Sequence, residues 1–124
     1  MSTSLNLKSR LRSFGHAFAG IGVMLRNEPN AWIHCFAAVA VIVAGILLRI
    51  SAWEWVAVVF AIGLVLAAEA FNSAIEQLSD VVQPEWDARI KDVKDLAAGA
   101  VLFCAIAAAV IGCIVFIPKI LALF

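Results

Sequence analysis

The chain has 124 residues, of which 65% are hydrophobic, with a mean hydropathy of +1.03 and a formal net charge of +0 at pH 7. These values exclude an ordinary soluble domain, and the length leaves room for three membrane spans and one short amphipathic segment. We therefore expect a single membrane domain over residues 1–124, whose functional site is built from the spans and their connections.

The N-terminal segment, about residues 5–27, is predicted to be an amphipathic helix at the membrane surface. Its apolar residues recur at alternating steps of four and three, and basic residues lie on or near the other side. A mitochondrial-type transit peptide shares this pattern. The surface helix is favoured because Glu28 and Pro29 mark a helix end that leads directly into the first span. A secretory signal is not expected, because no apolar region with a cleavage site follows the basic residues.

The first two spans follow in chain order. The first is predicted over residues 31–48, which carry one basic side chain, His34. We interpret His34 as a packed or interfacial residue, with a catalytic role as the alternative. The second span is predicted as one helix over about residues 53–82, because good helix formers continue beyond the apolar run until Pro84. The end of this helix should project from the membrane.

The second predicted helix carries four polar residues on one face: Glu69, Asn72, Glu76 and Asp80. At 100° per residue, the last three lie at roughly −60°, −20° and +20° relative to Glu69, and the stripe is about 16 Å long. One end lies in hydrocarbon and the other reaches water. Charged side chains at membrane depth are costly and usually functional. The stripe therefore indicates a site where a buried reactive group meets a soluble reagent that carries a cation.

Residues 81–95 are predicted to form a linker between the second and third spans. Pro84 ends the helix, and Trp86 offers a stacking surface. Three residues are interpreted as solvated surface charge: Arg89, Lys91 and Asp92. Lys94 and Asp95 directly precede the third span, so we expect the Lys94 ammonium to contact phosphates while the Asp95 carboxylate holds it in place.

The third span is predicted over residues 96–118, which carry no charge. Seven of the nine basic residues precede the first span or lie between the second and third, which leaves Arg49 and Lys119 for the other side. By the positive-inside rule, the N-terminus is expected in the cytoplasm and the C-terminus outside.

Two segments, EAFNSAIEQLSD at residues 69–80 and VKDLAAGAVL at residues 93–102, resemble the bacterial integral-membrane diacylglycerol kinase and undecaprenol kinase family. The similarity covers nearly the whole chain, and GCIVFIPK at residues 112–119 resembles the undecaprenol kinase branch. The resemblance implies an all-α membrane protein with a surface helix and three transmembrane helices. It also implies a homotrimer with shared sites in the bacterial inner membrane.

The resemblance further implies phosphoryl transfer from ATP, with Mg²⁺, to the hydroxyl of a membrane lipid alcohol, either diacylglycerol or undecaprenol. Glu69 would be the general base, Asn72 would orient the base or the hydroxyl, and Glu28 and Glu76 would bind the metal. Glu69, Asn72 and Ala98 would contact the lipid. The residues implied at the nucleotide are Arg10, His16, Glu28, Glu76, Asp80, Glu85, Trp86, Asp87, Lys94 and Asp95.

A small proton-coupled transporter or channel subunit is the alternative, because acids inside the membrane also suit ion relays. It accounts for Glu69 and Glu76 but poorly for Trp86, Lys94 and Asp95. A chain of three spans also lacks the inverted repeat common in transporters. A noncatalytic assembly subunit is a third possibility, and no nucleic-acid partner is expected.

Overall fold

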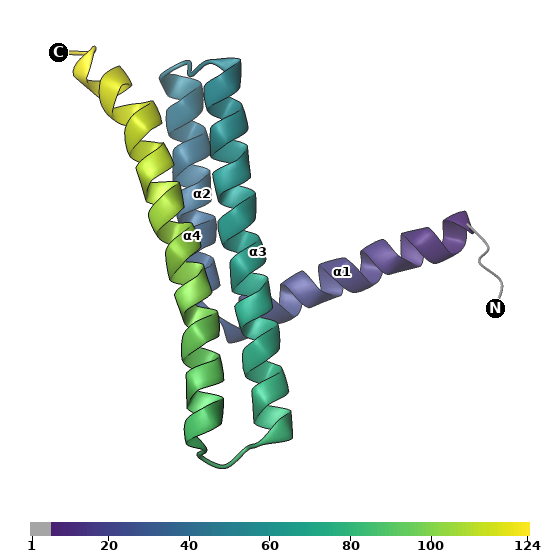
Figure 1. Ribbon diagram of the computed structural model, residues 1–124. Coiled ribbons are helices and arrows are strands. Elements are labelled where there is room, and N and C mark those ends of the chain that lie inside the picture. Colours follow the sequence, from purple (N-terminus) through teal and green to yellow (C-terminus); the bar gives the residue numbers. More distant parts are fainter. Residues whose placement is uncertain (1–5) are drawn as a thin grey trace.

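A computed structural model describes residues 6–124 and shows four α-helices, with no strand in that range (Figure 1). The helices are α1 (Leu7–Asn27), α2 (Pro29–Leu47), α3 (Ala52–Val82) and α4 (Ala88–Leu121). The last three are each long and apolar enough to cross a membrane. The predicted all-α fold is therefore confirmed. The expected start of the first helix near residue 5 lies outside the described residues, and α4 extends beyond the predicted span 96–118 at both ends.

Helices α2, α3 and α4 run side by side, and α1 leaves this bundle sideways from the end where α2 begins (Figure 1). At 1.5 Å per residue, α2 is about 28 Å long and α3 about 46 Å. Helices α3 and α4 therefore continue past the start of α2 before they join. The C-terminus and the α2–α3 turn lie at the opposite end of the bundle (Figure 1).

Helix α1 protrudes from the bundle, and its predicted apolar stripe is not covered by the rest of the described chain. Five of its apolar side chains are largely exposed: Leu7, Leu11, Phe14, Phe18 and Ile21. Its one buried residue is Met24, close to the junction with α2. An apolar stripe left uncovered on a protruding helix suits the boundary between headgroups and acyl chains. Pro29 occupies the first turn of α2, where its missing N–H costs nothing.

The prediction of a linker over residues 81–95 is wrong, because α4 begins at Ala88. Asp87 caps this helix, and its side chain accepts the backbone N–H of Arg89 at 2.8 Å. The Arg89 guanidinium also donates to Asp87 and holds the pKa of that carboxyl at about 2. The charges expected in a loop therefore lie on the first two turns of a helix.

Gly45 is required where α2 approaches the start of α3. A Cβ at this position would lie 2.7 Å from the Trp55 ring and 3.1 Å from Ile50. We expect Gly45→Ala to lower the Tm, since overpacking costs about 1–3 kcal/mol. Gly63→Ala is the matched control: it lies inside α3, its Cβ would meet nothing within 4 Å, and alanine is the better helix former. Thermal unfolding of both variants in one detergent tests this, and equal Tm values would show that Trp55 yields without cost.

Candidate functional site

The polar stripe on α3 meets a different part of the chain at each of its acids. Glu69 faces α2, Glu76 faces the junction of α1 and α2, and Asp80 faces α4. Helical spacing puts these acids on one face of α3, as predicted from the sequence. The tertiary fold supplies their partners, so the stripe brings together side chains from several helices.

Glu69 is the most buried acid of the stripe, at 1% exposure. Its Oε1 lies 3.1 Å from Nε2 of His34, whereas its Oε2 has no hydrogen-bond partner. Asn72, at 8% exposure, likewise leaves its Oδ1 unpartnered. Buried polar atoms are nearly always hydrogen-bonded, so two unpartnered oxygens one helical turn apart are suited to receive a polar ligand group.

The contact between His34 and Glu69 was not predicted, because His34 was interpreted as a packed or interfacial residue. The structure places its ring against the deepest acid of the site. One signal was available in the sequence: His34 is the single acidic or basic side chain in the predicted span 31–48. Periodicity could not show that this position of α2 faces that position of α3.

Glu28 and Glu76 face each other where α1 joins α2. Partial burial, together with the neighbouring Glu76 carboxylate, raises the pKa of Glu28 above its ordinary value of 4.5. Two neighbouring carboxylates repel each other unless a proton or a cation lies between them. Residues 6–124 contain no group of three or more His, Cys, Asp or Glu side chains that could hold a metal ion. A cation at this pair would need further oxygen ligands from phosphates and water, as is common for Mg²⁺.

An open groove of about 550 Å³ lies between the ends of α3 and α4 and their connection. Trp86 is 80% exposed beside it, so its ring is free to stack on a planar group. Glu76 lines the groove and also faces Glu28, so it joins the two parts of the site. Among the residues predicted to bind nucleotide or lipid, the groove is lined by Glu76, Asp80, Glu85, Trp86, Asp87, Lys94, Asp95 and Ala98.

Lys94 pairs with Asp80 and not, as expected, with Asp95. Its Nζ lies 2.7 Å from Oδ1 of Asp80, while Asp95 accepts from Lys91 at 2.5 Å. The expectation failed because adjacent helical residues point about 100° apart, whereas residues four apart are neighbours. An ammonium group has three donors, so Lys94 keeps others for an anion in the groove.

The structure does not bring Arg10 and His16 to this groove. Both are exposed on α1, and neither is among the lining residues. Arg10 lies in the first turn of α1, at the end farthest from the bundle (Figure 1). Arg10 and His16 therefore do not contribute to the groove of their own chain.

The fold and the site define a small membrane enzyme of several spans. Its acids lie along α3 between an apolar interior and a water-accessible groove, which is lined by the Lys94 ammonium and the Trp86 ring. Such a site suits group transfer between a soluble anionic donor and an acceptor in the membrane. The chain belongs to the prokaryotic diacylglycerol kinase family, whose sequence profile matches residues 15–116.

Two relatives agree with this membership. The chain is 38% identical over 108 residues to the undecaprenol kinase of Bacillus subtilis (strain 168), a match that covers 87% of this chain and 88% of that protein. It is 38% identical over 114 residues to the diacylglycerol kinase of Synechocystis sp. (strain ATCC 27184 / PCC 6803 / Kazusa), covering 91% of this chain and 65% of that protein. The family resemblance is confirmed and the chain is a kinase, so the transporter alternative is not supported.

Proposed function

We propose that this lipid kinase transfers the γ-phosphoryl group of ATP to the hydroxyl of a membrane lipid alcohol. The product is phosphatidic acid if the alcohol is diacylglycerol and undecaprenyl phosphate if it is undecaprenol. The observation that carries the proposal is the row of acids on α3, which begins at a buried carboxylate and ends in an open groove. A lipid can present its hydroxyl at the buried end while its chains stay in the bilayer, and ATP reaches the other end from water.

Glu69 is the general base of this proposal. Its Oε2 takes the hydroxyl proton as the lipid oxygen bonds to the γ-phosphorus. The bond from that phosphorus to the bridging β–γ oxygen breaks, and ADP leaves. Asn72, one turn closer to the groove, hydrogen-bonds the hydroxyl or the base. Ala98 lines the groove with a small side chain, which leaves room for the lipid head.

Glu28 and Glu76 would hold Mg²⁺. The fit rests on the donor set, since the two facing carboxylates supply oxygen ligands and a divalent cation would relieve their mutual repulsion. Carboxylate oxygens are also the ligands that Mg²⁺ prefers. The ion would neutralise charge on the phosphates. Since Glu76 lines the groove, it sets where those phosphates lie relative to the base.

The groove would hold the nucleotide. The exposed Trp86 ring suits stacking on the base of ATP, and the Lys94 ammonium suits its phosphates. Asp80 holds Lys94 in place before the nucleotide arrives. Glu85, Asp87 and Asp95 complete the lining on the side of the connection.

Lys94→Met should raise the Kd for a nucleotide analogue by about tenfold or more, since a hydrogen bond to a charged group contributes about 1.5–3 kcal/mol. Lys119→Met is the matched control, because Lys119 also lies on α4 but forms its ion pair with Glu54 at the opposite end of the helix, away from the groove. The control should therefore change Kd little. Equilibrium binding to purified protein measures both, and equal losses would remove Lys94 from the phosphate site.

The proposal includes a homotrimer with shared sites, built from one kinase domain over residues 1–124. Arg10 and His16 would then contact nucleotide in a neighbouring subunit, which their exposure on the protruding α1 supports. The split of basic residues supports a bacterial inner-membrane orientation with the N-terminus in the cytoplasm and the C-terminus outside. Mass measurement in detergent and a reporter at the C-terminus test these points, and a fully active monomer or a cytoplasmic C-terminus would contradict them.

Competition between diacylglycerol and undecaprenol in the same micelles, with γ-labelled ATP and purified protein, tests the proposed function. We expect labelled lipid without any proton gradient, and the ratio of the two kcat/KM values identifies the preferred alcohol. Failure to label either lipid under conditions in which the protein binds nucleotide would contradict the proposal.

A further inference from the structure

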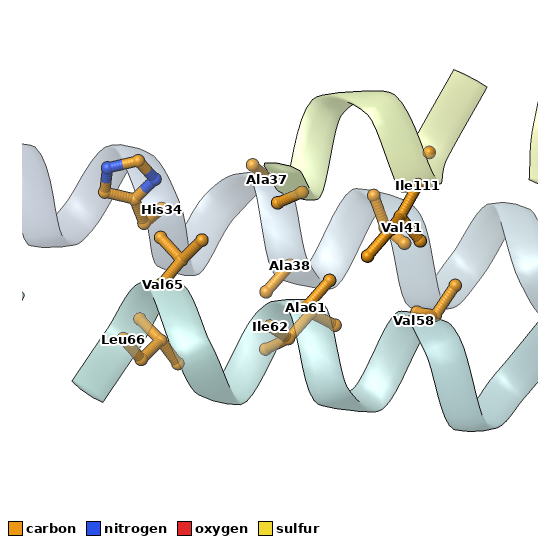
Figure 2. Close-up of a pocket in the computed structure, with 12 residues that line it drawn as sticks. His34, Ala37, Ala38, Val41, Val58, Ala61, Ile62, Val65, Leu66 and Ile111 are labelled. Atoms are coloured by element: carbon orange, nitrogen blue, oxygen red, sulfur yellow. The ribbon is translucent and has the colours of Figure 1, made fainter. Parts of the chain in front are cut away.

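An apolar groove of about 110 Å³ lies between α2, α3 and α4, within the segments able to span the membrane (Figure 2). Its lining is aliphatic except at one end, where His34 stands beside Val65 and Leu66 (Figure 2). His34 is also the residue that contacts Glu69. The ring therefore lies where the apolar lining gives way to the buried polar site.

The contact engages only one oxygen of the carboxylate. Oε1 of Glu69 lies 3.1 Å from Nε2 of His34, with 23% of the His34 side chain and 2% of the Glu69 side chain exposed. Oε2 is buried and has no partner. An ionised carboxylate has no donor, so a hydrogen bond across this contact would take its proton from Nε2. Contact through Oε1 alone leaves Oε2 to accept a second proton donor.

We propose that His34 is a positioning residue: its Nε2–H holds Glu69 by Oε1, so that Oε2 is directed at the hydroxyl of the lipid substrate. This inference rests on the proposed function, in which Glu69 is the general base. An aligned base matters because a displacement of about 1 Å in a catalytic group can cost 10²-fold in rate. His34 itself touches neither the hydroxyl nor the phosphate in this role.

Two substitutions at one position separate positioning from packing. His34→Leu fills similar space without a donor, and we expect it to lower kcat by about 10²-fold with little change in nucleotide Kd. His34→Gln keeps an N–H donor at a similar reach, and we expect it to recover most of that loss. Thermal unfolding of both variants shows whether each is folded. If His34→Leu and His34→Gln had the same Tm and lost kcat to the same extent, the inference would be overturned.

A double-mutant cycle with Glu69→Gln asks whether His34 acts through Glu69. If it does, His34→Leu should add little to the loss already caused by Glu69→Gln, because the base to be aligned is gone. Independent losses that multiply would overturn the positioning role, as would full activity in His34→Leu.

The failure of this inference can be told apart from the failure of the proposed function. An impaired Glu69→Gln with a fully active His34→Leu overturns the inference alone. A fully active Glu69→Gln, or wild-type protein that phosphorylates neither lipid, overturns both.

Discussion

Glu69→Gln should lower kcat for lipid phosphorylation by about 10²-fold or more while nucleotide affinity stays unchanged. Glutamine keeps the shape of the side chain but cannot take the proton from the hydroxyl. Nucleotide affinity should survive because Glu69 lies about 10 Å along α3 from Glu76, which lines the groove proposed to hold the nucleotide. Single-turnover phosphorylation and equilibrium nucleotide binding, measured on the same preparation, separate the two effects.

Glu54→Gln is the matched control for this substitution. Glu54 also lies on α3, but at the opposite end, where its side chain accepts the backbone N–H of the N-cap residue Ser51 and lies 3.1 Å from Lys119. Its replacement should leave the chemical step unchanged. Loss of nucleotide binding in Glu69→Gln, with an unaltered chemical step, would instead assign Glu69 to the nucleotide or the metal.

The second large effect is expected at the facing carboxylates. Glu76→Gln should lower Mg²⁺-dependent activity by about 10²-fold or more, because a bound metal ion supplies several kcal/mol of charge stabilisation and each 1.36 kcal/mol is tenfold in rate. Glu28→Gln should act in the same direction. Activity measured over a range of Mg²⁺ concentrations distinguishes weaker metal binding from a slower step at saturation.

Thermal unfolding provides a readout of the metal site that does not depend on activity. Mg²⁺ should raise the Tm of the wild-type protein, and this shift should vanish in Glu76→Gln. In EDTA the variant should be at least as stable as the wild type. Burial and the Glu76 charge raise the pKa of Glu28 above 4.5 in the folded state. The wild-type protein should therefore lose stability as the pH rises from 4.5 through that raised pKa, and the variant should lose less.

Asp92→Asn is the control for both metal-site variants, since Asp92 is exposed on α4 and does not line the groove. It should keep both the activity and the response of the Tm to Mg²⁺. If Glu28→Gln and Glu76→Gln behaved as this control does, the metal assignment would be wrong.

The sequence predicted the fold well because the physics of a membrane span is local. A run of apolar residues long enough to cross the bilayer has few alternatives to a helix, since no other open structure satisfies its backbone groups. The error at residues 81–95 came from treating charge as evidence of a loop. No Pro or Gly follows Pro84 before Gly99, and Asp87 is a good N-cap residue. The start of α4 near residue 88 could therefore have been predicted from the sequence.

The sequence predicted which acids share a face of α3, but it did not predict the residues that they contact. Helical geometry alone places Glu69 and Asp80 on the same face of α3. It does not reveal what each acid faces, because that depends on how separate helices pack. Lys94 and Asp80 are 14 residues apart in sequence, and their contact follows from the turn that folds α4 back onto α3. His34 was missed for the same reason.

The burial of Glu69 bears on a competing reaction. Water is a far more abundant hydroxyl compound than any lipid, and a kinase that let its base activate water would hydrolyse ATP without making product. Excluding water from a closed site suppresses such side reactions. If Glu69 is the base, as proposed, the group that activates the acceptor is a carboxylate side chain that is almost fully buried. Burial of the base in the membrane would then favour a lipid hydroxyl over water, even without contacts that recognise a particular lipid.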